Sequence, residues 1–172
     1  MDKDTYFRDS YRDLMDYGFQ LRKEKIDRFN VVIATKKEFS ISSEAVYMNI
    51  FVIMAFMRKI TEKDIKEYFT IAHDYIIEYS RDLEKTLEAE SVFFAILASH
   101  DVSEEAKQWV LTGIREYCCA YEMPLIYDMQ EKELYYCRVP EKGVKYYEHF
   151  HDLIDYLSTV HYEEKSEEVQ NP

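Results

Sequence analysis

The sequence places polar residues of catalytic type at the ends of three apolar stretches. Residues 30–35, 92–98 and 123–127 are the stretches, and the residues that end or follow them are Thr35, Lys36, Lys37, Ser99, His100, Asp101 and Asp128. Ligands of open sheets bind beyond the carboxyl ends of parallel strands. If the three stretches were parallel strands, His100 could act as a general base beside Asp101, Asp128 and Lys36. Ser99, Thr35 and Lys37 would then be binding residues.

These residue types also have an ordinary structural explanation, which we favour. Asp101 is suited to cap a helix, Asp128 to form a turn, and His100 to lie exposed at a strand end. Turn and cap chemistry therefore accounts for them without catalysis. The leading hypothesis is a non-catalytic binding or regulatory protein, and the alternative is a hydrolytic or degenerate nuclease-like enzyme.

The central element is predicted at residues 92–98, seven consecutive apolar residues typical of a strand covered on both faces. An apolar stripe over residues 103–119 predicts a helix, with Asp101 and Ser103 as N-cap candidates. Pro124 excludes a continued helix, so residues 123–127 and 133–138 are predicted to form strands of a hairpin. A strand, a helix and a second strand imply a crossover connection with parallel pairing.

The N-terminal half alternates between helical and extended patterns. We expect a helix over residues 4–17, ended by Gly18, and a hairpin of residues 19–21 with 30–35, although residues 22–28 could instead extend a helix. Residues 45–57 contain one polar residue, Asn49. This predicts a helix packed on all sides, the most buried element and too short to cross a membrane.

A capping pattern, Thr61 to Asp64, begins another predicted helix that runs to about residue 79, with residues 81–90 as an extension or a loop. A turn at 140–143 and a last helix around residues 147–157 complete the fold. The fold class is α+β, with a mixed sheet of four or five strands and helices packed on it. We expect a single domain over residues 1–162 and an acidic, disordered tail over 163–172.

A helix, then Gly18 and Phe19, then the run from Phe29 to Ala34 resembles the opening of restriction-endonuclease-like nucleases over about 20 residues. In that family a helix precedes a hairpin whose second strand carries a metal-binding Asp, followed by an acid-x-Lys pair. Asn30 stands at the matching position here, and no acid-x-Lys pair follows on the strand. The resemblance therefore implies a fold of that type without its catalysis.

The composition limits the classes of partner that we expect this protein to bind. A net charge of −12 disfavours nucleic acid and membrane surfaces. Sixteen tyrosines and ten phenylalanines suit a protein interface, and hence a protein partner or a homo-oligomer, or else the edges of an aromatic-rich core. Six cations and two carboxylates give residues 22–37 a charge of +4, which would suit phosphate contacts or form a solvated hairpin.

No cofactor or metal is implied. Three glycines cannot build a Gly-rich nucleotide loop. The nearest metal-like cluster is interpreted as a solvated helix face; it comprises His149, His151, Asp152 and Asp155. The three cysteines are interpreted as small buried hydrophobes; they are Cys118, Cys119 and Cys137. The chain opens with polar residues and no signal-peptide pattern, which favours the cytoplasm.

Overall fold

The computed structural model describes residues 2–40, 46–83, 89–112, 115–117, 120–138 and 153–154. Its elements are α1 (Lys3–Asp16), β1 (Gln20–Ile26), β2 (Phe29–Ser40), β3 (Val46–Phe56), α2 (Glu62–Leu83), β4 (Ala89–Ser99), α3 (Glu104–Val110), β5 (Arg115–Tyr117), β6 (Ala120–Asp128) and β7 (Glu133–Tyr135). The predicted α+β class is confirmed. The mixed sheet has the order β1-β2-β3-β4-β6-β5, and β7 also pairs with β6, so it contains more strands than the four or five expected.

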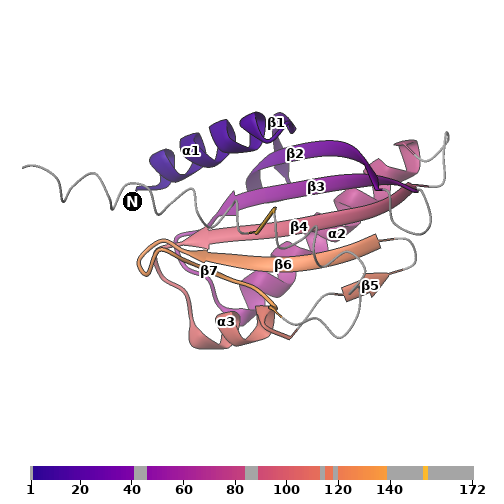
Figure 1. Ribbon diagram of the computed structural model, residues 1–172. Coiled ribbons are helices and arrows are strands. Elements are labelled where there is room, and N and C mark those ends of the chain that lie inside the picture. The colour runs from indigo at the N-terminus through magenta and orange to yellow at the C-terminus, as the bar shows by residue number, and fades with distance from the viewer. Residues whose placement is uncertain are drawn as a thin grey trace, which may run out of the picture.

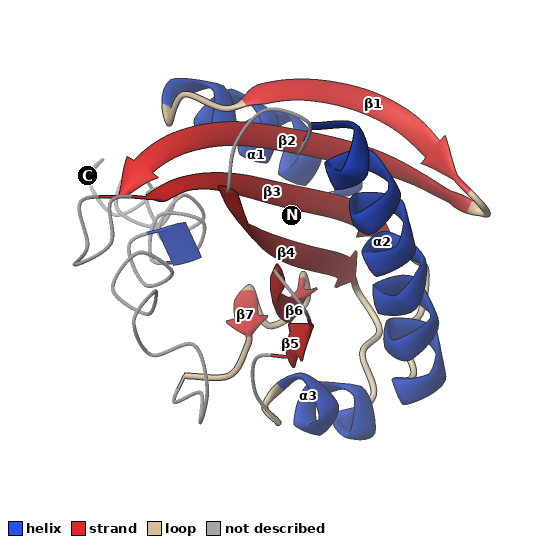
Figure 2. Cartoon of the chain, turned by 90° about the vertical axis from the view of Figure 1, so that its right-hand side faces the viewer, coloured by secondary structure: helices blue, strands red, loops and turns tan. Residues whose placement is uncertain are grey.

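Helices cover both faces of this sheet. Figure 1 shows α1 along one face and α2 and α3 along the other. Figure 2 shows α2 running beside the curved sheet, with α3 next to its lower end. Two buried clusters follow from this arrangement, one that includes Leu14 of α1 and one that includes Ile65 of α2 and Val110 of α3.

The predicted central strand is confirmed as β4. Residues 92–98 are each at most 1% exposed, and β4 pairs in parallel with both β3 and β6. Alternate side chains enter the two clusters, with Phe94 and Ile96 on the α1 side and Phe93 on the α2 side. The strand is apolar throughout because neither of its faces meets water.

The helix predicted over residues 45–57 is wrong, because this segment forms strand β3 between β2 and β4. Met54 and Val52 face α1 while Ile53 and Phe51 face α2, so both faces are buried. A strand covered on both faces shows no alternation, and an apolar run then has the same pattern as a buried helix. The expected burial of the segment is confirmed, since residues 50–55 are at most 4% exposed.

The N-terminal helix and hairpin are confirmed. Asp2 caps α1 by accepting a hydrogen bond from the backbone N–H of Thr5 (2.9 Å), and Gly18 follows the helix with φ +90°. β1 and β2 pair antiparallel and are joined by a two-residue turn in which Asp27 has φ 50°. Residues 22–26 are therefore part of the strand rather than of a connection or a helix.

The capping pattern of α2 is also confirmed. The backbone N–H of Thr61 donates to Asp64 Oδ2 (3.0 Å), and the hydroxyl of Thr61 donates to the same atom (2.6 Å). The helix continues to Leu83, beyond the expected residue 79. No helix in the described part of the chain combines the length and apolar character needed to cross a bilayer.

The helix predicted over residues 103–119 is too long. Ser103 caps α3 as expected, but α3 ends at Val110, and Arg115–Tyr117 forms β5 on the edge of β6. The hairpin of β6 with β7 is confirmed. Residues 153–154 are helical and pack in the α1-side cluster. The rest of the predicted last helix, the turn at 140–143 and the tail at 163–172 lie outside the described residues.

Candidate functional site

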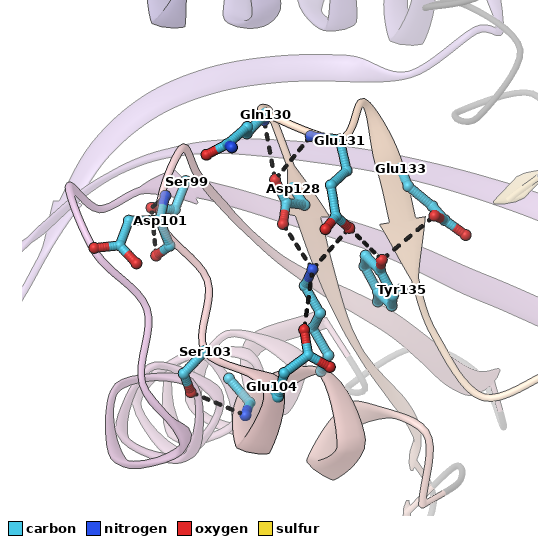
Figure 3. Close-up of polar contacts among 11 residues, drawn as sticks. Ser99, Asp101, Ser103, Glu104, Asp128, Gln130, Glu131, Glu133 and Tyr135 are labelled. Carbon is cyan, nitrogen blue, oxygen red and sulfur yellow. Dashed lines mark hydrogen bonds and ion pairs between the residues drawn. The ribbon is translucent and has the colours of Figure 1, made fainter.

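Ser99 and Asp128 are the last residues of β4 and β6, and Asp101 follows in the loop after β4 (Figure 3). Ser99 and Asp128 are register partners in adjacent parallel strands, and the backbone N–H of Met129 donates to the Ser99 carbonyl oxygen (2.8 Å). The Ser99 hydroxyl oxygen accepts from the backbone N–H of Asp101 (3.0 Å) and lies 3.1 Å from the carbonyl oxygen of Arg58. These contacts fix the loops that leave both strands.

The side chain of Lys107, on α3, contacts the carboxyl end of β6. Its side chain is 5% exposed, and its Nζ lies 2.9 Å from Asp128 Oδ2 and 2.7 Å from Glu131 Oε2. The same Nζ lies 4.6 Å from the centre of the Tyr135 ring. Desolvation lowers the pKa of Lys107, but hydrogen bonds to Glu131 and Asp128 outweigh it, so the net shift is upward. Lys107 therefore stays charged and holds the two carboxylates.

Both carboxylate oxygens of Asp128 are engaged. Oδ2 faces Lys107, while Oδ1 accepts from the backbone N–H groups of Gln130 (2.9 Å) and Glu131 (3.1 Å). The second set of bonds closes the turn between β6 and β7. Asp128 therefore does the structural work that its position in a turn predicts.

The described contacts do not bring His100 or the Asp101 carboxylate onto Asp128. The ring of His100 packs 6.2 Å from that of Phe56, which belongs to the α1-side cluster, whereas Lys107 and Asp128 lie on the α3 side. The Asp101 carboxylate pairs with Lys59 Nζ (3.2 Å) and points away from Asp128 in Figure 3.

The expectation that Lys36 joins this strand end is wrong, because β2 runs antiparallel to β3. Lys36 lies opposite Ile50, which pairs with Val92 near the start of β4. Val92 is seven positions from Ser99, about 23 Å along a strand. Lys36 instead pairs with Glu38 and packs 4.5 Å from the Tyr17 ring.

Thr35 and Lys37 share this distant end of the sheet. With Lys36 they line a cavity of about 440 Å³ that also includes Asn49 and Tyr79. The seven residues predicted from the sequence are thus divided between opposite ends of the sheet. Three of them, Ser99, Asp101 and Asp128, are neighbours, and they are held by structural contacts.

A larger cavity lies where β1, β2 and β3 meet the first turns of α1. Its volume is about 620 Å³. We call it the lysine pocket and define it by Lys3, Phe7, Lys23, Lys25, Asn30 and Phe56, which line it with Asp4, Glu24, Arg28, Val32 and others. It lies beyond the carboxyl end of β3 and includes residues of both faces of the sheet, Val32 of the α1-side cluster and Phe29 and Val31 of the α2-side cluster. A volume in this range is typical of small-molecule sites.

The lysines of this pocket form no ion pairs with described residues, although Lys23 Nζ lies 5.7 Å from the centre of the Tyr11 ring. Within the described part of the chain, no carboxylate oxygen lies within ion-pair distance of Lys3, Lys23 or Lys25. Lys3 lies 5.2 Å from the centre of the Phe56 ring. Arg28, by contrast, donates to Glu67 (3.0 Å).

Glu24 is turned to the other face of the sheet. Its Oε1 accepts from Arg22 Nε (2.7 Å) and its Oε2 accepts from the Tyr75 hydroxyl (2.6 Å). These hydrogen bonds, that from Tyr75 most, hold the pKa of Glu24 below its usual value. Glu24 therefore does not neutralise the lysines of the pocket.

A second polar pair was missed by the sequence analysis. His73 Nδ1 of α2 contacts Glu122 Oε1 of β6, and Glu122 is completely buried. Among the described residues, no group of His, Cys, Asp and Glu is arranged to hold a metal ion. The His149 to Asp155 cluster, Cys118 and Cys119 lie outside those residues, and Cys137 is buried as a free thiol.

One sequence signal did point to the lysine pocket. The +4 charge of residues 22–37 includes Lys23 and Lys25, but Lys3 lies 20 positions away and is joined to them only by the packing of α1. Comparison of the chain with protein-family models, with curated proteins and with solved structures finds no match.

Proposed function

We propose that this protein is a cytoplasmic, non-catalytic binding protein that takes a small ligand into the lysine pocket. The observation that carries the proposal is a concave site of about 620 Å³ with three lysines that form no ion pair with a described carboxylate. Ligand sites combine a concave apolar surface with a few polar groups that fold-stabilising contacts leave available. Phe7, Val32 and Phe56 supply the apolar part here.

The polar groups at the ends of β4 and β6 support a non-catalytic function. A general base must have a free acceptor within reach of the substrate proton. Asp128 is 4% exposed, and Lys107 and two backbone N–H groups already bond to both of its oxygens. His100 contacts Phe56 on the other side of the sheet. A hydrolytic mechanism would have to break the Lys107–Asp128 bridge before it began.

The tyrosines give less support to a protein interface than the composition suggests. None of the nine tyrosines whose side chains the structure describes is exposed; they are Tyr6, Tyr11, Tyr17, Tyr68, Tyr75, Tyr79, Tyr127, Tyr135 and Tyr136. The only exposed large apolar side chains among the described residues are Met15 and Leu111. The tyrosines therefore fill the core and its edges, and the concave site is the better candidate for recognition.

The test is protein-observed NMR with a library of small fragments of mixed charge. We expect the backbone cross-peaks that shift to belong to residues 3–7, 23–32 and 56–57, and each fragment to be recovered unchanged. Chemical conversion of a fragment, or shifts confined to residues 99–101 and 128–135, would overturn the proposal. So would a library that moves no cross-peak of the pocket.

A further inference from the structure

We infer that the ligand of the lysine pocket is a small phosphate monoester with an apolar, ring-sized body. This inference rests on the proposed function and specifies the ligand. The features that carry it are three lysines from two elements, one opposing carboxylate, and the half-buried rings of Phe7 and Phe56 in the lining.

The lysines line the pocket from a helix and from a strand. Lys23 and Lys25 are two positions apart on β1, so their side chains leave the same face of the sheet, roughly 7 Å apart at the backbone. Their register partners are Val32 and Asn30, which also line the pocket. Lys3 enters from α1, and its ammonium group lies over the Phe56 ring. An anion between α1 and β1 would therefore meet cations on two sides.

The charge count favours a dianion. Lys3, Lys23 and Lys25 oppose Asp4, and Arg28 and Glu24 are engaged elsewhere, so the pocket carries a surplus of two positive charges. A phosphate monoester carries between about −1.5 and −2 charges at pH 7. A carboxylate carries one and would leave part of the surplus uncompensated. Lysine binds phosphate as a mobile point charge and does not require the fixed geometry of an arginine fork.

The helix N-terminus does not supply the anion site. The side chain of Asp2 accepts a hydrogen bond from the backbone N–H of Thr5. The backbone carbonyl oxygen of Asp2 accepts another from the backbone N–H of Tyr6 (3.1 Å). The first turn of α1 is thus capped by a carboxylate of its own. Recognition of the anion depends on the lysine side chains. The lysines can therefore be substituted to test anion binding while the N-cap of α1 stays intact.

The apolar part of the lining requires a ligand with more than a phosphate group. Phe7 and Phe56 are half-buried, and Val32 forms the part of the pocket on β2. Inorganic phosphate would leave these groups in contact with water. A ring on the phosphate would remove apolar surface from water on both partners and strengthen binding.

The experiment titrates the full chain with four probes: 1-naphthyl phosphate, 1-naphthoate, 1-naphthol and inorganic phosphate. Cross-peak shifts of residues 3–7, 23–32 and 56–57 report binding. We expect 1-naphthyl phosphate to bind at least about tenfold more tightly than each other probe, because it alone combines two charges with a ring. Equal affinity for 1-naphthoate, 1-naphthol or inorganic phosphate would overturn the inference.

The double variant Lys23→Gln with Lys25→Gln should bind 1-naphthyl phosphate about tenfold or more weakly than the parent chain. The matched control is Lys63→Gln with Lys66→Gln, which removes the same charge from exposed positions of α2 on the other face of the sheet. We expect this control to bind within about twofold of the parent chain, because distant surface charges are screened. An equal loss in both variants would reduce the effect to net charge and overturn the inference.

The outcome also separates this inference from the proposed function. If 1-naphthol alone shifts the cross-peaks of the pocket, the proposed binding function stands, and the inference that the ligand is a phosphate monoester is wrong. If neither these probes nor the fragment library moves them, both fail. Far-ultraviolet circular dichroism of each variant shows that a loss of affinity does not come from unfolding.

Discussion

The Nζ atom of Lys107 lies 2.9 Å from Oδ2 of Asp128, and each of the two side chains is 5% exposed. Asp128 ends a strand that pairs in parallel with β4, and Lys107 belongs to the short helix that follows β4. The bridge therefore joins the two halves of a strand–helix–strand unit at the point where a ligand site would be expected. Its charges are used to hold α3 and the β6–β7 turn in place.

Replacing Lys107 with Met should lower the free energy of unfolding by about 3 kcal/mol, because it leaves the buried carboxylate of Asp128 without its cation. Urea unfolding followed by circular dichroism measures the change. Lys63→Met is the matched control, since Lys63 is exposed, and it should change stability by at most about 0.5 kcal/mol. Equal unfolding midpoints for the two variants would show that the bridge does not stabilise the fold.

The pKa of Glu24 predicts a pH dependence of stability. Its folded-state pKa lies below 4.5 because Tyr75 and Arg22 donate hydrogen bonds to it. A depressed folded pKa contributes stability that is present above the unfolded value and is lost as the pH falls through the folded value. Glu24→Gln should therefore be less stable than the parent chain at pH 7.

The difference between Glu24→Gln and the parent chain should shrink as the pH falls below 4.5, where the parent carboxylate takes up a proton and resembles the amide. Urea midpoints of both proteins between pH 7 and pH 3.5 test this. A difference that stays constant over that interval would mean that the charge of Glu24 does not contribute. Glu67→Gln is a comparison on α2, where the carboxylate contacts Arg28 near the surface.

The sequence correctly predicted those structural features that depend on a few adjacent residues. The cap of Thr61 with Asp64, the end of α1 at Gly18 and the apolar run of β4 each depend on a few adjacent residues, and each is where the sequence placed it. β3 could not be recognised in this way. Its identity as a strand depends on being covered by α1 on one face and α2 on the other, and that is a property of the folded chain.

The site was predictable only in part, for the same reason. Ser99 and Asp128 were placed together by the rule for parallel strands, and they are register partners. Lys36 was misplaced because the rule needs the direction of β2, which the apolar pattern of residues 30–35 does not contain. Lys3 joins Lys23 only through the packing of α1 on the sheet, and no sequence spacing encodes that contact.

Arg22 should fasten the edge strand β1 to α2. Its guanidinium carbon lies 4.4 Å from the centre of the Tyr79 ring, and Nη2 donates to the Tyr75 hydroxyl (2.9 Å). Lysine cannot reproduce a planar group that stacks and donates at once. Arg22→Lys should therefore lower the free energy of unfolding by about 1 kcal/mol.

Hydrogen exchange should locate this loss in the amides of β1 and the adjacent β2. Arg8→Lys serves as the control, because the Arg8 side chain is 70% exposed and pairs with the neighbouring Asp9. Faster exchange in Arg22→Lys that is confined to α1, or that equals the change in Arg8→Lys, would contradict the role of Arg22 as a clamp.

The pair of His73 and Glu122 offers the sharpest test of how α2 is held on the sheet. Glu122 is completely buried beside Phe93, its register partner on β4, and His73 approaches it from α2. His73→Phe should lower the free energy of unfolding by about 3 kcal/mol, because a buried carboxylate loses a hydrogen-bonding partner. Urea unfolding at pH 7 measures the loss.

The double variant His73→Phe with Glu122→Met should recover most of that stability, because a buried polar pair replaced by apolar side chains of similar volume is often neutral. The control is Glu122→Met alone, which should be less stable than the double variant, since it places an apolar side chain against the polar edge of the half-buried imidazole. If the two single losses simply add in the double variant, the residues do not act as a pair. Recovery would instead show that the contact between α2 and β6 needs complementarity at this position and not a charge.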